Sequence, residues 1–454
     1  MRLVPALLAV LALAACGTPQ TPVDRRTPEL DLPPMKTFSA PRAARTTKSN
    51  REIARDFMEL SFFLESGREL PVFTRFEGPV SVRVTGRATP SLGRDLDRLL
   101  ARLRGEAGID IARVSSDASA SITIEVVSRA ELQRAVPQAA CFVVPRVASW
   151  AEFLRFRNSS RLDWTTLEVR ERMAIFLPGD VAPQEVRDCL HEELAQALGP
   201  LNDLYRLPDS VFNDDNFHTV LTGFDMLVLA ATYAPELRSG MSPDAVAATL
   251  PAVLDRLNPR GRGGDAVGPD PTPRAWIDAI ETALGPSASP IRRRVAAREA
   301  VAIATREGWS DTRLAFSLYA LGRLTLGSEP ELALASFLQA GAIYRDDPET
   351  QLQAAHISMQ LAAFALSAGQ PDVAAEIVDR NLRAVADAEN AALLSTLLMV
   401  KAEALAALGR GDEAEEVRRD SLGWARYGFG TEAEVRSRAR EIAALRPDLR
   451  GDRT

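Results

Sequence analysis

The chain has 454 residues, which is more than one hydrophobic core usually serves, so two or three domains are expected. Apolar residues make up 46% of the sequence and charged residues 25%, and this composition excludes a disordered chain. The formal net charge of -7 offers no electrostatic attraction for nucleic acid or for an anionic membrane surface. We therefore expect no nucleic-acid partner.

The first residues indicate export. Arg2 precedes an apolar stretch that is too short to remain in a bilayer as a helix. This stretch ends in Leu13-Ala14-Ala15-Cys16, which resembles the lipobox of bacterial lipoproteins. The resemblance implies a signal peptide over residues 1–15 and a lipid anchor on Cys16; the alternative is an ordinary secretory signal in which this cysteine is incidental. Gly17 in place of Asp implies sorting to the periplasmic face of the outer membrane.

Residues 16–48 are rich in Pro and Thr and have no apolar period, so they predict a flexible tether. The two remaining cysteines, Cys141 and Cys189, form an even pair. In an oxidising periplasm we expect a disulfide between them. Two buried thiols are the alternative.

Residues 49–257 have the mixed pattern of an α+β domain. Ser49 is a good N-cap for a helix that we expect to run to Gly67. Strand-like stretches and one amphipathic helix follow: the expected strands are 79–86, 120–128, 140–146 and 172–179, and the expected helix is 91–108. A second amphipathic helix opens near Pro183 and ends at Gly199. Strands before this helix and mostly helices after it predict a small sheet packed under it.

Residues 258–274 have the composition of a loop and are expected to form a linker or a long surface loop. Residues 275–450 are rich in Ala and Leu and have no strand pattern. Within them, Pro330, Pro371 and Gly411 occupy equivalent places before Ala-bearing helices, about forty residues apart. The pattern resembles tetratricopeptide repeats, with a longer period, and predicts an all-α helical-repeat domain. A plain helical bundle is the alternative.

The stretch from His191 to Asp203, HEELAQALGPLND, carries the motif with the most chemical content. Zinc peptidases of the HExxH type use two imidazoles one helical turn apart, with a Glu between them as the base. The position four residues after His191 is Ala195, so this frame fails. One residue later the spacing resembles that of metzincin peptidases, with Glu193 at the place of the catalytic Glu. In this frame, Glu192 and Gln196 stand at the places of the two helix ligands. Gly199 is the turn glycine of the motif, and Asn202 stands at the place of the third ligand.

Two further motifs extend the resemblance. Leu221-Thr222-x-x-Asp225, followed by Ala230 to Tyr233, resembles the terminal helix of a matrixin-type domain, although Phe212 stands in place of its methionine. Over roughly residues 50–255 the chain is also similar to bacterial envelope lipoproteins with domain-of-unknown-function family 2927. The shared segments are Asp56-Phe57, Leu64 to Arg68, Arg75 to Pro79, Cys189 with Glu192 to Asp203, Ser210 to Asp215, and Tyr233 to Met241. The family's function is not established, so this resemblance implies no activity.

Oxygen atoms replace nitrogen at the expected ligand positions. Glu192, Gln196 and Asn202 offer a carboxylate and two amides, a set better suited to Ca²⁺ or Mg²⁺ than to Zn²⁺. A zinc site of His191, His218 and a carboxylate is an alternative that no spacing supports. We therefore expect no cofactor and assign no metal ligand.

Together these patterns favour a function without catalysis. We expect a peptidase-like domain that has lost its chemistry, and a helical-repeat surface that binds a protein partner at the envelope. One alternative is a periplasmic peptidase or peptidoglycan-directed hydrolase with Glu193 as general base. The other is a coincidental similarity to peptidases.

Overall fold

The computed structural model describes residues 32–38, 45–264 and 270–447. The expected signal peptide, Cys16 and much of the expected tether therefore lie outside the described residues. None of the helices within the described ranges combines the length and the apolar character needed to span a bilayer.

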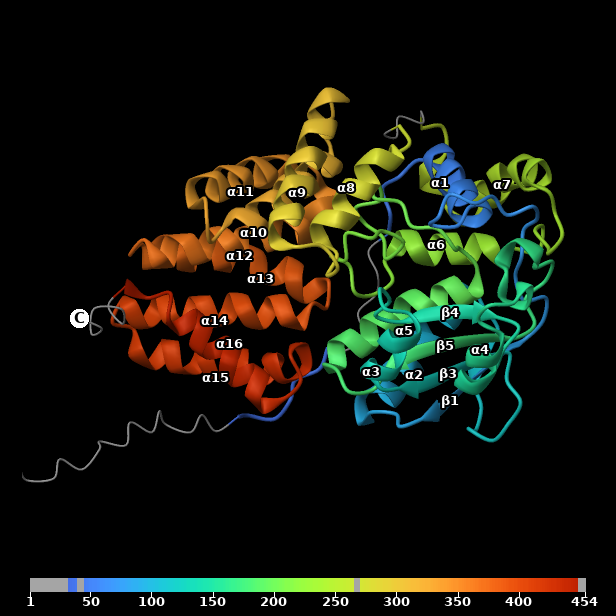
Figure 1. Cartoon of the computed structure of the whole chain (residues 1–454), viewed down its shortest axis with the longest axis horizontal. Coiled ribbons are helices and arrows are strands. Elements are labelled where there is room, and N and C mark those ends of the chain that lie inside the picture. Colours follow the sequence, from blue (N-terminus) through green and yellow to red (C-terminus); the bar gives the residue numbers. More distant parts are fainter. Residues whose placement is uncertain (1–31, 39–44, 265–269, 448–454) are drawn as a thin grey trace, which may run out of the picture. The chain divides into compact units, whose positions relative to one another are not determined.

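Five strands form one mixed sheet in the first half of the chain (Figure 1). In chain order they are β1 Val80–Gly86, β2 Ile111–Arg113, β3 Ile122–Val127, β4 Phe142–Pro145 and β5 Met173–Pro178. Their order in the sheet is β2-β1-β3-β5-β4; the first four are mutually parallel, and β4 runs antiparallel to β5 at one edge. Because β1 and β2 are parallel neighbours, the chain crosses back between them through a helix, α2 (Pro90–Glu106).

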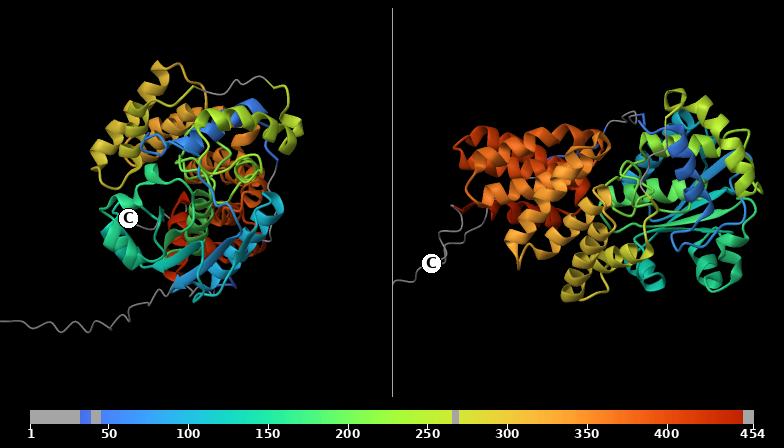
Figure 2. Two further views of the ribbon diagram at one scale, coloured as in Figure 1. Left: turned by 90° about the vertical axis from the view of Figure 1, so that its right-hand side faces the viewer. Right: turned by 90° about the horizontal axis from the view of Figure 1, so that it is seen from above.

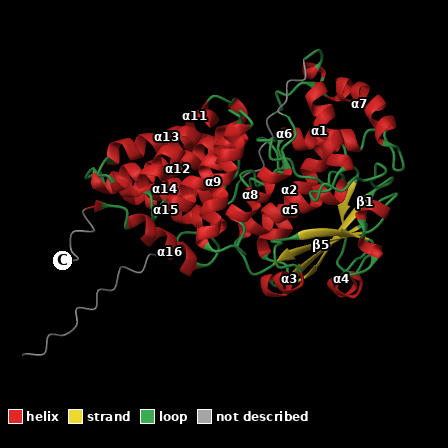
Figure 3. Cartoon of the chain, turned by 45° about the horizontal axis from the view of Figure 1, so that its top comes forward, coloured by secondary structure: helices red, strands yellow, loops and turns green. Residues whose placement is uncertain are grey.

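Alternation along β5 divides its side chains between two cores. Met173, Ile175 and Leu177 belong to the larger core, which contains residues of α1, α2, α5, α6 and α7. Ala174 and Phe176 belong to a smaller core with α3 and α4, on the other side of the strands (Figure 3). All of β5 is buried, as expected for a strand covered by helices on both faces. The helices of this part are α1 Asn50–Phe62, α2, α3 Arg129–Ala135, α4 Trp150–Phe156, α5 Pro183–Leu198, α6 Gly223–Thr232 and α7 Pro243–Leu257.

The prediction of an α+β region followed by an all-α region is confirmed. The four expected strands correspond to β1, β3, β4 and β5, whereas β2, α3 and α4 were not expected. Ser49 caps α1 as expected, but this helix ends at Phe62 rather than at Gly67. The reason is local: Phe63 is extended and pairs with Glu69 in an antiparallel bridge, and Gly67 closes the intervening turn with φ of 79°.

Helices α1 and α7 lie side by side in Figures 1 and 2. Asn50 in α1 donates a hydrogen bond from Nδ2 to Oδ1 of Asp255 in α7 at 2.7 Å. The larger core extends between these helices through Ile53, Phe57 and Leu250. Packing of α7 on α1 therefore joins the beginning and the end of the α+β region.

Beyond Arg274, the described chain contains helices joined by short turns and no strand. From α8 to α16, each helix packs against the one that follows it (Figure 1). They are α8 Arg274–Leu284, α9 Pro290–Arg306, α10 Thr312–Thr325, α11 Pro330–Arg345, α12 Gln351–Ser367, α13 Pro371–Asp387, α14 Ala391–Ala407, α15 Gly411–Gly428 and α16 Glu432–Ala443. Pro330, Pro371 and Gly411 are the first residues of α11, α13 and α15. The sequence period therefore corresponds to one pair of helices.

Candidate functional site

The motif lies on α5, which follows β5 directly in the chain. Pro183 is the first residue of the helix, where the absent N–H has no intrahelical partner to lose. Gly199 ends the helix, as expected from the sequence. A Cβ at Gly199 would lie 3.0 Å from Cγ2 of Thr232, so the glycine permits close packing of the end of α5 on the last turn of α6.

A disulfide joins Cys141, immediately before β4, to Cys189 in the middle of α5. The two Cα atoms are 5.9 Å apart, and 48 positions separate the residues in sequence. The bond attaches the motif helix to the antiparallel edge strand of the sheet.

Glu193 is 4% exposed, and its Oε2 has no hydrogen-bond partner among the described residues. Burial raises the pKa of this carboxyl well above its usual value, and the neighbouring carboxylates Glu192 and Glu65 raise it further. These effects favour the protonated carboxyl, which cannot accept a proton from water. The position that the metzincin frame assigns to the base is therefore in an environment that opposes this role.

Glu192 is less buried than Glu193. Burial raises the pKa of Glu192 to about 8, with further contributions from Asp214, Glu65 and Asp188.

Gln196 and Asn202, the other two ligand positions of the metzincin frame, are engaged in different bonds. Gln196 Nε2 donates to Oδ2 of Asp203 at 3.4 Å. Asn202 Nδ2 donates to the carbonyl oxygen of Glu59 in α1 at 3.2 Å, while its Oδ1 accepts the N–H of Asp203 at 3.1 Å. Asn202 thus attaches the loop after α5 to α1, and both Gln196 and Asn202 bond to Asp203.

Five carboxyl groups interact electrostatically around α5, and we refer to them as the acidic cluster: Glu65, Glu192, Glu193, Asp203 and Asp214. Burial raises the pKa of Asp203 well above its usual value, and Asp214, Glu65 and Glu192 add to the rise. A hydrogen bond between the side chains of Glu65 and Asp203 requires one of these carboxyls to carry a proton. Burial likewise raises the pKa of Asp214 to about 7. Protons therefore balance much of the charge of this cluster, and the Arg274 guanidinium acts on Asp214.

Sequence reasoning missed three members of the cluster. Asp203 directly follows Asn202 in the motif, and Asp214 lies in the Ser210 to Asp215 segment, so both were within recognised motifs. Glu65 lies in the turn after α1, within the recognised Leu64 to Arg68 segment, but no local pattern associates it with α5. Only the fold brings these carboxyls together.

The carbonyl end of α5 is capped by a buried arginine. Arg170 is 2% exposed and donates to the carbonyl oxygens of Gln196 and Gly199, and from Nε to Oγ1 of Thr74 at 3.2 Å. Burial lowers the pKa of Arg170 to about 10, so it stays protonated near neutral pH. Its charge satisfies carbonyls that have no partner within the helix and matches the negative end of the helix dipole.

His191 has different contacts from His218 and His356, and the last two interact electrostatically. His191 Nδ1 accepts the N–H of Leu221 at 3.1 Å, and burial, with the nearby Arg187, keeps the pKa of this imidazole well below its usual value. His218 Nε2 lies 3.9 Å from Oδ1 of Asp209, and the His356 ring packs on Phe217 with centroids 4.7 Å apart. His191 and His218 thus have separate partners, and their contacts offer no support for a shared zinc site.

The region after the motif has the expected local structure. Thr222 is the N-cap of α6 and forms a capping box with Asp225, and Tyr233 is its C-cap. Asp225 also accepts hydrogen bonds from the Ser210 hydroxyl and from the N–H of Val211. The Tyr233 hydroxyl donates to the carbonyl oxygen of Leu198 at 3.0 Å, which connects α6 to the end of α5.

Zinc does not fit the residues at the metzincin positions. The donors are a carboxylate and two amides, and one of these amides is bonded to the backbone of α1. Among the residues that the structure describes, no group of three or more His, Cys, Asp and Glu side chains is arranged to hold a metal ion. The nitrogen ligands of a zinc peptidase are therefore not present at these positions.

Residues 50–252 match the model of a family described as "Protein of unknown function (DUF2927)". Searches of curated proteins and of solved structures gave no match. The match covers the sheet and α1 to most of α7, and the helical region from α8 onward follows it.

Proposed function

We propose that this chain is a lipoprotein of the bacterial envelope, anchored through Cys16 at the periplasmic face of the outer membrane. Its α+β region would keep the layout of a metzincin-like peptidase without the chemistry, and its helical pairs, resembling tetratricopeptide repeats, would bind a protein partner. The lipobox-like sequence that ends at Cys16 supports the anchor. The disulfide between Cys141 and Cys189 supports an oxidising compartment, because such bonds persist there and are rare in the cytosol.

The absence of catalysis rests on one observation: the positions that would hold and serve a zinc ion have other tasks. Asn202 is bonded to α1, and Gln196 is bonded to Asp203. Glu193 lies in surroundings that favour its protonated form. A zinc peptidase needs a metal-coordinated water and a base that is ionised at the working pH.

Protein binding is supported by the distribution of exposed apolar side chains. Seven large hydrophobic side chains are exposed among the described residues, and all but Leu154 lie in the helical region. Ile291 is 69% exposed and Val295 61%, one turn apart on α9. Residues four apart lie on the same side of a helix, so this pair forms a small apolar surface. Exposed apolar surface is a common feature of protein-binding sites.

The test compares variants of the full chain in envelope preparations after chemical cross-linking. A protein cross-linked to the wild type should be recovered at equal yield with Glu193→Gln, since this carboxyl has no catalytic task. The Ile291→Ser/Val295→Ser double variant should reduce the yield by about tenfold or more, because burial of each side chain contributes about 1.5 kcal/mol or more.

Leu154→Ser, at 43% exposure on α4, is the matched control and should leave the yield unchanged. Equal loss in this control, or no loss in the double variant, would reject the helical surface as the binding site. Loss of cellular function in a folded Glu193→Gln variant would favour the hydrolase with Glu193 as general base. Stoichiometric zinc in the purified chain would likewise favour the hydrolase.

A further inference from the structure

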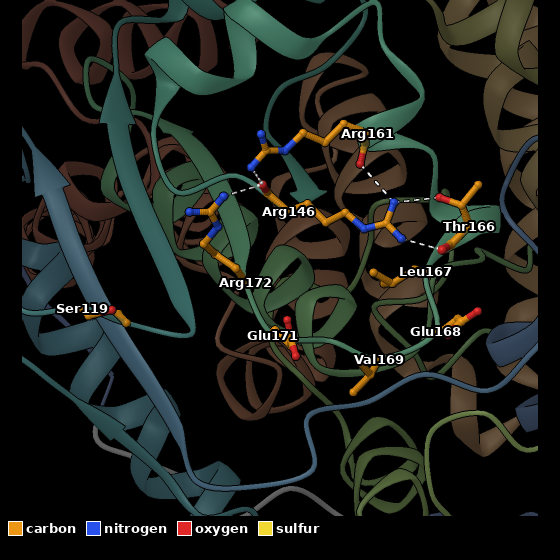
Figure 4. A pocket seen from close by; sticks show the side chains of 10 residues that line it. Ser119, Arg146, Arg161, Thr166, Leu167, Glu168, Val169, Glu171 and Arg172 are labelled. Carbon is orange, nitrogen blue, oxygen red and sulfur yellow. Dashed lines mark hydrogen bonds between the residues drawn. The ribbon is translucent and has the colours of Figure 1, made fainter.

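A cavity of about 620 Å³ opens where β3 and β5 begin and β4 ends (Figure 4). It is lined by Ser119, Ala120, Arg146, Arg161, Thr166, Leu167, Glu168, Val169, Glu171 and Arg172. Neither the motif on α5 nor the acidic cluster contributes to this lining, so the cavity is a separate feature of the α+β region.

Three arginines at this cavity are connected by hydrogen bonds between their guanidinium groups and backbone carbonyls. The Arg146 carbonyl oxygen accepts hydrogen bonds from Nη2 of Arg161 at 3.1 Å and from Nη2 of Arg172 at 2.9 Å. The Arg146 guanidinium donates in turn to the Arg161 carbonyl oxygen at 3.2 Å and to Oγ1 of Thr166 at 2.7 Å. Figure 4 shows these bonds around the cavity. Like charges are thus kept close together by backbone carbonyls.

Arg146 is one of the few non-glycine residues with positive φ in the described chain, at 64°. The left-handed conformation costs about 1 kcal/mol or more for a residue with a Cβ. Its N–H donates to the Arg172 carbonyl oxygen at 2.7 Å, so both backbone polar groups of Arg146 are bonded. Local strain that the surrounding structure maintains is often found at binding sites.

Charges of both signs border the same cavity. Within the described ranges, neither Arg146 nor Arg161 forms an ion pair, and Arg172 approaches only Glu152, at 3.6 Å. Glu168 and Glu171 also line the cavity and form no ion pair within those ranges. A ligand that carries both a negative and a positive group would complement this lining.

On the side of residues 167–172, the wall of the cavity is attached to α5 through Arg170. Arg170 lies between the lining residues but is buried, and it bonds to the carbonyl end of α5. Arg161 is held by its contact with the Phe156 ring, 4.3 Å from the centroid. Donors that are already in position bind a ligand at a lower entropic cost.

We propose that this cavity binds a small zwitterionic carboxylate of the amino-acid or short-peptide class. The guanidinium groups of Arg161 and Arg172 bind the carboxylate, because their planar N–H pairs match its two oxygens. Glu168 and Glu171 face the ammonium group. A doubly charged phosphate fits less well, since both glutamates repel it.

The test is ligand-observed NMR with the full chain, using ¹H signals for glycylglycine and acetate and ³¹P signals for inorganic phosphate. Glycylglycine should bind more tightly than acetate, and phosphate should not exceed acetate. Arg161→Gln should weaken binding of glycylglycine and acetate by about tenfold, which corresponds to one lost charge-assisted hydrogen bond. Glu171→Gln should weaken the binding of glycylglycine and leave the binding of acetate unchanged.

Arg94→Gln, an exposed arginine on α2 outside the lining, is the matched control and should leave binding unchanged. If Arg161→Gln fails to fold, Arg161→Lys keeps the charge without the planar donor pair and should still weaken acetate binding. The proposal is overturned if no probe binds, if phosphate binds most tightly, or if Arg94→Gln has the same effect as Arg161→Gln.

Discussion

At the scale of single residues, the unusual feature is the accumulation of buried carboxyl groups around α5, where burial raises the pKa of each. Burial raises the pKa of Glu192 to about 8 and that of Asp214 to about 7. The folded chain therefore keeps protons that the unfolded chain releases near pH 4.5. Since these groups bind more protons in the folded state over this interval, their contribution to the free energy of unfolding decreases as the pH rises from 4.5 to about 8.

Glu192→Gln should remove one contribution to this decrease, because the amide resembles the protonated carboxyl and does not titrate. We expect the variant to exceed the wild type in unfolding free energy at pH 8 by about 2 kcal/mol, allowing for partial solvent screening. The difference should shrink towards pH 4.5. Urea denaturation at several pH values measures it, with Glu299→Gln, an exposed position on α9, as the control. Parallel pH profiles for Glu192→Gln and wild type would contradict the assignment.

At the scale of elements, α5 is the helix to which the other parts of the α+β region are attached. Cys189 joins it to the start of β4, and Arg170 caps its carbonyl end. Leu190, Leu194 and Leu198 bury its apolar side in the larger core. These contacts fix the place of α5 in the α+β region without any contribution from Glu192 or Asn202.

Loss of the disulfide should destabilise the chain strongly. In the chain-entropy model, a cross-link across 48 positions contributes about 4 kcal/mol. We expect Cys141→Ser/Cys189→Ser to lower the free energy of unfolding by about this amount, and reduction of the wild type to have the same effect. Urea denaturation with and without reductant provides the measurement. A reductant effect that persists in the double variant would show that another process is responsible.

At the scale of the whole described chain, buried polar contacts join the α+β region to the helical region. Arg187 in α5 pairs with Glu389 at 3.1 Å, and Tyr427 in α15 donates to Oδ2 of Asp95 in α2 at 2.9 Å. Gln353 in α12 donates to the carbonyl oxygen of Pro208 at 2.6 Å. Buried polar groups must find partners, so these contacts make the two regions depend on each other.

Arg187→Ala should test this dependence, because it leaves the buried Glu389 carboxylate without its cation. We expect a loss of about 3 kcal/mol in the free energy of unfolding. Glu185 lies on α5 as well and forms an exposed ion pair with Arg129 in α3. Glu185→Ala breaks this pair and should cost less than about 1 kcal/mol. Arg187→Met/Glu389→Met should recover much of the loss. Equal effects of the two single variants in urea denaturation would refute a joining role for Arg187.

The sequence by itself determined the local structure. Alternation of apolar residues identified β1, because side chains of a strand point to opposite faces. Strand-like apolar stretches identified β3 and β5, and β2, α3 and α4 were not expected. Pro183 and Gly199 located the ends of α5, and Pro330, Pro371 and Gly411 located the starts of alternate helices. These signals are short-range: the conformation of a cap or a turn depends on the residue itself and its immediate neighbours. The motif on α5 was likewise recognised from spacing alone.

Only the tertiary structure decided which side chains meet. Glu65 joins the acidic cluster from the turn after α1, and Arg187 finds its partner at Glu389, 202 positions away. Asn202 bonds to α1 although its spacing matched a ligand position. The arginines at the cavity come from three separate segments, and no local pattern connects them. Contacts of this kind depend on how the strands and helices pack, and periodicity and spacing along the chain carry no information about it.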